Sequence, residues 1–101
     1  MTDADIHDNA DAHRYELAIG DQTAIVAYNL SGHNLMITET LVPEALEGQG
    51  VASRLARHVI ADALDRGLMI LPVCPFFSAY LQKHPEHAEV VHPTYRDILG
   101  L

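Results

Sequence analysis

Hydrophobic and polar positions alternate through the first part of the chain and predict three consecutive strands. Apolar side chains occupy every second position from residue 15 to residue 19, and Gly20-Asp21 then supplies a turn. Two further β-rich runs cover residues 23–30 and 35–42, with a polar turn at residues 31–34 between them. Connections this short favour an antiparallel meander.

The hydrophobic period changes after Pro43. Apolar residues between positions 51 and 64 recur with helical spacing, and charged residues fill the opposite side, so an amphipathic helix is predicted there. Gly67 suits its C-terminal end. The apolar run at residues 68–73 predicts a buried strand, and a helix that connects two strands of one sheet favours a right-handed crossover.

The C-terminal third predicts shorter elements. Pro75 suits the first turn of a second helix over residues 76–83, which Pro85 brings to an end. Val90 and Val91 are candidates for a last strand, and residues 95–99 for a final turn of helix.

Length and composition fit one compact domain. The chain has 101 residues, of which 49% are hydrophobic, enough for a single core and too few for two. Residues 1–12 are acidic and show no period, so we expect a flexible arm there, followed by a single domain over residues 13–101.

Charge and cysteine content exclude several classes of protein. Six Lys and Arg residues against fourteen Asp and Glu give a net charge of -8, which opposes binding to a nucleic-acid backbone over a broad surface. No apolar run approaches the roughly 18 residues of a membrane span. The single cysteine has no internal disulfide partner, and the acidic start is unlike a signal peptide, so a cytoplasmic location is expected.

The loop Gly48-Gln49-Gly50 comes directly before the predicted long helix. Glycines let a backbone approach a ligand closely, and the first N–H groups of a helix together carry about half a positive charge. Residues 50–53 therefore form a candidate site for a phosphate or pyrophosphate, with Arg54 and Arg57 one turn further on. The alternative is a tight turn that only connects a strand to a core helix.

Cys74 lies between the predicted buried strand and the helix that begins at Pro75. A helix N-terminus favours the thiolate, so Cys74 is a candidate reactive thiol. The alternative is a buried cysteine that acts as a small hydrophobic residue.

Glu39 is anomalous in its predicted strand. Strict alternation places it on the same face as Leu35, Ile37 and Leu41, where a partly buried carboxylate is a candidate general base. A bulge or a half-exposed strand would remove the anomaly, and the sequence leaves both interpretations open.

The histidines and aromatic residues predict no metal site. His84, His87 and His92 are close in sequence, but Pro85 interrupts any common helical face and no acidic ligand set accompanies them. Phe76, Phe77 and Tyr80 have helical spacing typical of a core, and the Tyr80 hydroxyl could reach a site.

The order of these segments resembles a known family. The succession consists of Thr38-Glu39-Thr40-Leu41-Val42-Pro43, residues 47–53, residues 71–76, Tyr80-Leu81 and His84-Pro85. It is similar to the GCN5-related N-acetyltransferases, and specifically to their short single-domain subgroup, over roughly residues 13–92. At three positions the chain departs from the pattern: Ala45 where the superfamily usually has Arg or Gln, Glu47 where the subgroup often has Arg, and Glu39 where it tends to have His.

The resemblance implies an α+β fold, with a mixed, mainly antiparallel sheet and two helices in a minimal single domain. It also implies acetyl-CoA binding, with the pyrophosphate on the backbone N–H groups of residues 48–53 and the pantetheine beside the strand that ends at Val42. The cofactor-binding residues expected on this basis are Leu41, Val42, Gly48, Gln49, Gly50, Val51, Ala52, Ser53, Arg54 and Tyr80. Cys74 stands where the subgroup carries a proposed catalytic cysteine.

Three functions remain open from the sequence. The first is acetyl transfer from acetyl-CoA to an unidentified amine, without a metal, with Glu39 as base and Cys74 either as proton donor or as acetyl carrier. The second is a non-catalytic module that binds acyl-CoA or a partner with the same fold. The third is a small structural domain that binds no CoA.

Overall fold

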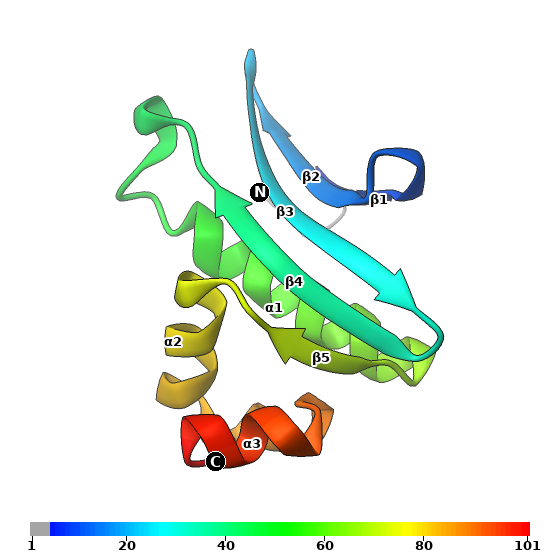
Figure 1. Cartoon of the computed structure of the whole chain (residues 1–101). Coiled ribbons are helices and arrows are strands. Elements are labelled where there is room, and N and C mark those ends of the chain that lie inside the picture. The colour runs from blue at the N-terminus through cyan, green and yellow to red at the C-terminus, as the bar shows by residue number, and fades with distance from the viewer. Residues whose placement is uncertain (1–4) are drawn as a thin grey trace.

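The computed structural model describes residues 5–101 as one five-stranded sheet with one long helix behind it and shorter helices beside its last strand (Figure 1). The strands lie side by side in chain order: β1 (Ile6–Asn9), β2 (Arg14–Ile19), β3 (Gln22–Ser31), β4 (Asn34–Leu41) and β5 (Met69–Pro72). The pairs from β1 to β4 are antiparallel, and β5 pairs parallel to β4. The predicted α+β fold with a mixed, mainly antiparallel sheet is confirmed.

Three α-helices follow the meander: α1 (Val51–Arg66), α2 (Pro75–Lys83) and α3 (Pro93–Leu99). Three 3-10 turns connect the elements: η2 (Ala10–Ala12), η3 (Glu44–Leu46) and η4 (Pro85–Val90). Gly67 ends α1 in the left-handed conformation, as its position predicted. Besides the two helices expected, α3 forms where residues 95–99 were a candidate for a final turn of helix, and Val91 makes only a single parallel bridge to Ile70 instead of a strand.

The N-terminal segment differs from the sequence prediction. Residues 6–9 form the edge strand β1, in which Ile6 pairs with Leu17 and is only 5% exposed. A flexible arm was expected over residues 1–12, but residues 6–12 form a paired strand and a 3-10 turn. Residues 1–4 of the expected arm lie outside the described residues. β1 belongs to the same sheet as the strands predicted to follow it.

The core lies between one face of the sheet and α1, which crosses behind the strands in Figure 1. Alternate residues of every strand point into it, for example Leu17, Val26 and Ile37, all fully buried. From α1, Leu55, Val59 and Ile60 meet them. This packing explains the helical period seen in the sequence.

The opposite side of the sheet, here called the open face, carries the other alternate residues. Figure 1 shows no described helix in front of β3 and β4 on this side. Its residues are half-buried or exposed, and several are apolar: Ile25, Ala27, Met36, Met69 and Leu71. The two faces of the sheet thus have different surroundings.

Two buried tyrosines tie β2 and β3 to their neighbours. The Tyr15 hydroxyl donates to Asp62 of α1 at 2.6 Å, and the Tyr28 hydroxyl donates to Asp8 of β1 at 2.5 Å. Arg66 lies 3.0 Å from Asp62 and 3.4 Å from Asp8 and joins the two pairs. Burial, with the adjoining carboxylates, raises the pKa of both tyrosines above the usual range.

None of the helices between residues 5 and 101 is long and apolar enough to cross a membrane.

Candidate functional site

A bulge in β4 settles on which side of the sheet Glu39 lies. In the β3–β4 register Tyr28 opposes Ile37 and Ala27 opposes Glu39, so no β3 residue opposes Thr38, whose hydroxyl donates to the Ala27 carbonyl at 3.2 Å. Beyond this extra residue the alternation of side chains is inverted. Glu39 is exposed on the open face, and the bulge interpretation of its anomaly is confirmed.

The same inversion turns Thr40 toward the core side, opposite the buried Val26. Sequence reasoning did not select Thr40 as a site residue, although it lies in the stretch 38–43 that carries the family resemblance. Only the bulge shows which of the neighbouring polar residues faces the interior.

Strands β4 and β5 stop pairing at Ile37 and Pro72. The Ile37 carbonyl accepts two hydrogen bonds there, from the backbone N–H groups of Val73 at 3.0 Å and of Cys74 at 2.9 Å. Beyond this divergence point β4 continues along β3, while the chain after β5 turns into α2 (Figure 1). The last residues of β4 therefore have no partner on the β5 side.

Cys74 lies at the divergence point and is 4% exposed. It is the N-cap residue of α2, and its carbonyl accepts from the Ser78 N–H at 3.0 Å. Its Sγ atom lies 3.4 Å from Oγ1 of Thr40, and either atom could be the donor. The structure thus places a thiol, a hydroxyl and a helix N-terminus together where the two strands separate.

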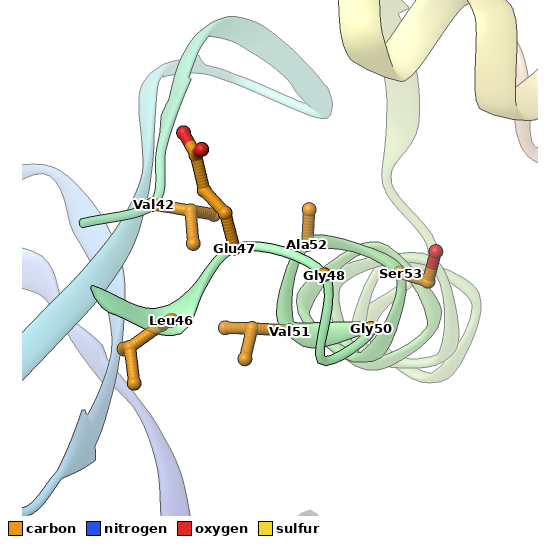
Figure 2. A pocket seen from close by; sticks show the side chains of 8 residues that line it. All are labelled: Val42, Leu46, Glu47, Gly48, Gly50, Val51, Ala52 and Ser53. Carbon is orange, nitrogen blue, oxygen red and sulfur yellow. The ribbon is translucent and has the colours of Figure 1, made fainter. Parts of the chain in front are cut away.

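The glycine loop forms an open pocket of about 160 Å³ between the end of β4 and the start of α1 (Figure 2). Its lining consists of Val42, Leu46, Glu47, Gly48, Gly50, Val51, Ala52 and Ser53. Gly48 and Gly50 have φ angles of 81° and 72°, a region that strains any residue with a side chain. A Cβ atom at either glycine would meet no atom of the protein within 4 Å, so the space beside the turn is open.

The N-terminus of α1 suits a negatively charged ligand. Gly50 is its N-cap and offers no side chain to the first turn, which contains no acidic residue. The first backbone hydrogen bond of the helix runs from Arg54 to the Gly50 carbonyl, so the N–H groups of Val51, Ala52 and Ser53 have no acceptor within the helix. Such groups at the end of a 16-residue helix bind phosphate readily.

Glu47 is the one carboxylate in the pocket lining. In Figure 2 its side chain extends on the Val42 side and away from the Gly48–Gly50 turn. A negative charge at this position weakens the attraction that the helix terminus exerts on an anion.

The other predicted site residues are dispersed around these two groups. Val42 lines the pocket, whereas Leu41 is 50% exposed on the open face. Gln49 donates from its side chain to the Ala45 carbonyl at 3.3 Å and thereby braces the loop. Arg54 is half-buried one turn further along α1.

Tyr80 is buried in α2, where its ring stacks on His84 with centroids 4.3 Å apart. Phe76 lies one helical turn before Tyr80, and the centroids of the two rings are 6.2 Å apart. Tyr80 thus belongs to an aromatic cluster of α2.

Within residues 5–101 no three side chains of His, Cys, Asp or Glu come together as a metal would need. His84 lies 3.3 Å from Glu86, and its ring is 6.3 Å from that of His87.

The candidate site thus consists of two groups near one end of β4: the N-terminus of α1 at Gly50 and the thiol–hydroxyl pair of Cys74 and Thr40. In comparison with known proteins, residues 14–90 match the family model described as GCN5-related N-acetyl-transferase. None of the curated proteins compared with the chain matches it. The match spans most of the chain, including both parts of the site, and the chain belongs to the GCN5-related N-acetyltransferase family.

Proposed function

We propose that this protein is an acetyl-CoA-dependent N-acetyltransferase that acts on a primary amine. The observation that carries the proposal is the arrangement at the end of β4. A loop that contains η3 connects this strand to the helix terminus at Gly50, and the Cys74–Thr40 pair lies beside the last residues of the strand. A ligand with a phosphate at one end and a thioester at the other fits this arrangement in chemical character.

The residues around the glycine loop suit the diphosphate part of CoA. The N–H groups of Val51, Ala52 and Ser53 would receive the phosphate oxygens, and the absence of side chains at Gly48 and Gly50 leaves room for close approach. Val42 and Leu46 offer apolar contacts in the same pocket. The thioester group, when bound, supplies an activated acyl carbon.

In the direct mechanism Glu39 acts as the base and Cys74 as the acid. Glu39 takes the proton from the amine, through a water molecule if needed, as the nitrogen attacks the acyl carbon. Backbone N–H groups of the diverging strands polarise the carbonyl oxygen. The Cys74 thiol gives its proton to the departing sulfur, and the Thr40 hydroxyl holds that thiol in place.

In the second mechanism Cys74 carries the acetyl group. Its sulfur attacks the acyl carbon, the bond from that carbon to the CoA sulfur breaks, and CoA leaves with the thiol proton. The amine then attacks the new thioester on Cys74, the bond from the acyl carbon to the Cys74 sulfur breaks, and the amine proton returns to that sulfur. Cys74 is the N-cap residue of α2, so its side chain lies beside the first turn of that helix. The two mechanisms differ in whether acetylated Cys74 accumulates when no amine is present.

Two observations favour a second candidate, a non-catalytic module that binds acyl-CoA. Glu39 lies on the opposite side of β4 from Thr40, and Glu47 places a negative charge in the pocket. This candidate predicts CoA binding with no transfer to any amine.

Titration calorimetry with acetyl-CoA and with CoA is the first test. Gly50→Trp strains the turn and fills the space beside it, so binding should be lost. Gly32→Trp is the matched control, because Gly32 is also exposed, has a φ of 61° and lies in the turn between β3 and β4. Equal binding by both variants would contradict the proposed cofactor site.

Release of free CoA thiol with a panel of primary amines then separates the two candidates. Turnover that requires an amine supports the transferase. Saturable binding without turnover on any amine supports the non-catalytic module.

A further inference from the structure

We propose that the acceptor is a primary amine with one ammonium group and an apolar body, bound on the open face around Glu39. This inference rests on the proposed function and adds the chemical class of its second substrate. The juxtaposition that carries it is a single carboxylate among exposed apolar side chains, next to the divergence point of β4 and β5.

The charge distribution of the open face is the first step. Through β3, β4 and β5, all of whose residues are described, the side chains that alternate onto this face include one ionisable group, Glu39. Arg14 of β2 pairs with Ala27 of β3, and Ala27 pairs with Glu39 of β4. Arg14 is therefore level with Glu39 but two strands away from it. Its guanidinium is held by Glu16 at 2.6 Å. Among the side chains of β3, β4 and β5 on this face, Glu39 therefore presents the one negative charge to solvent.

The apolar residues around this carboxylate are the second step. Leu41 is 50% exposed and follows Glu39 on the same face of β4. Val73, 47% exposed, follows β5 at the divergence point. Met36 and Leu71 pair with each other just before the divergence point and are half-buried. Solvent-exposed aliphatic side chains on both sides of one carboxylate match a ligand with a charged head and an apolar body.

The chemistry of transfer is consistent with this position. Residues 39 and 40 are neighbours, so Glu39 and the Thr40–Cys74 pair flank the same short piece of β4 from opposite faces. The bound ammonium first gives one proton through Glu39 to solvent, which leaves a lone pair on the nitrogen. As this amine nitrogen bonds to the acyl carbon, the carbon–sulfur bond breaks. The surplus proton of the nitrogen passes to Glu39, and the Cys74 proton passes to the departing sulfur. Water then returns the proton from Glu39 to Cys74.

A polyamine would fit this face poorly. Glu39 can pair with one ammonium, and any further ammonium would lie over Leu71, Val73 or Leu41 without a carboxylate partner on these strands. By the same argument, kcat/KM should be lower for hydrophilic amines than for apolar amines of similar size.

The test compares kcat/KM for butylamine, hexylamine, octylamine and 2-phenylethylamine with that for spermidine, at saturating acetyl-CoA. We expect kcat/KM to rise roughly twofold to fourfold per added methylene, because each buried methylene contributes about 0.8 kcal/mol. Met36→Gln and Val73→Asn should flatten this dependence. Ile98→Gln is the control, since Ile98 is 67% exposed on α3, and it should leave the dependence unchanged.

A preference for spermidine, or equal kcat/KM across the alkylamines, would overturn this inference and leave the proposed transferase intact. If no amine is acetylated although acetyl-CoA binds, the transferase itself is wrong. The acceptor surface is then tested alone, by the NMR shift of the Met36 methyl group on titration with octylamine in the presence of CoA. A saturable shift that Glu39→Gln weakens several-fold supports the surface, and no shift, or one unchanged in Glu39→Gln, overturns it.

Discussion

The Thr40 hydroxyl lies 3.4 Å from the Cys74 sulfur, although 34 positions separate the two residues in the chain. The contact exists because Thr38 is unpaired in β4, which turns Thr40 inward, and because β5 ends at Pro72, which brings Cys74 to the same level. Two departures from regular strand pairing thus produce the only hydrogen bond shown for the Cys74 side chain within residues 5–101.

Thr40→Val should lower kcat and leave the KM for acetyl-CoA nearly unchanged. The substitution keeps the shape of the side chain and removes one hydrogen bond, worth about 1 kcal/mol, so a roughly fivefold loss in kcat is expected. Steady-state kinetics at saturating amine measure it. Thr23→Val, at an exposed position of β3, is the matched control. A change in KM alone would show that Thr40 serves binding and not the thiol.

Glu47→Gln should tighten CoA binding. The carboxylate lines the pocket at the α1 terminus, and its removal eliminates a repulsion that we expect to cost roughly twofold to fivefold in affinity at low salt. Glu44→Gln is the control, because Glu44 is exposed in η3 and outside the pocket lining. Calorimetry at two ionic strengths checks the result: the gain should shrink at high salt. Equal effects of both substitutions would assign the change to net charge alone.

Acid should destabilise the β1–β2 edge through Glu16. Hydrogen bonds from Arg14 and then from Asn9 hold the pKa of Glu16 below its usual range. A lowered pKa means that the folded state binds the proton less readily, so this contribution is complete above the ordinary glutamate pKa and is lost as pH falls through the lowered value. Urea unfolding between pH 7 and pH 3 measures it.

Arg14→Ala should therefore flatten the acid side of the stability profile. Arg57→Ala, at an exposed position of α1, should leave it unchanged. An identical profile in wild type and Arg14→Ala would refute the assignment to Glu16.

Alkali should unfold the protein through Tyr15 and Tyr28. The pKa of both hydroxyls is raised, first by burial and then by their carboxylate partners. Their contribution to stability is complete below the ordinary tyrosine pKa and is lost as pH rises through the raised values. Absorbance at 295 nm and circular dichroism, followed together, should show these two tyrosines ionising as the fold is lost.

Tyr15→Phe and Tyr28→Phe should each reduce the late absorbance change and cost about 1 kcal/mol near pH 7. Ionisation of both tyrosines well before unfolding would contradict the partly buried hydrogen bonds to Asp62 and Asp8.

Most of the fold could be predicted because each long element has one buried face. Alternation over residues 14–19 and helical spacing over residues 51–64 follow directly from packing against a single core. Strand β1 could not be predicted in this way, since Ile6 is its only buried residue. Its other ties are polar, such as Asp8 to Tyr28, and depend on residues distant in the sequence.

Part of the local geometry at the candidate site could also be predicted from the sequence. The glycines at positions 48 and 50 are visible in the sequence because a left-handed turn requires them. The side of the sheet taken by Glu39 and Thr40 depends on one unpaired residue, and no periodic pattern shows where a strand gains an extra residue.

Thr38 therefore determines which side chains at the end of β4 face the core and which face solvent. If Thr38 instead paired with Ala27 in a regular ladder, strict alternation would continue from Ile37 and the roles of the next two residues would be exchanged. The Glu39 carboxylate would then face Val26 and the thiol in the interior, and the Thr40 hydroxyl would stand in solvent. One residue without a partner in the register thus places the two neighbouring polar side chains on opposite faces of the sheet, Thr40 toward the core and Glu39 toward water.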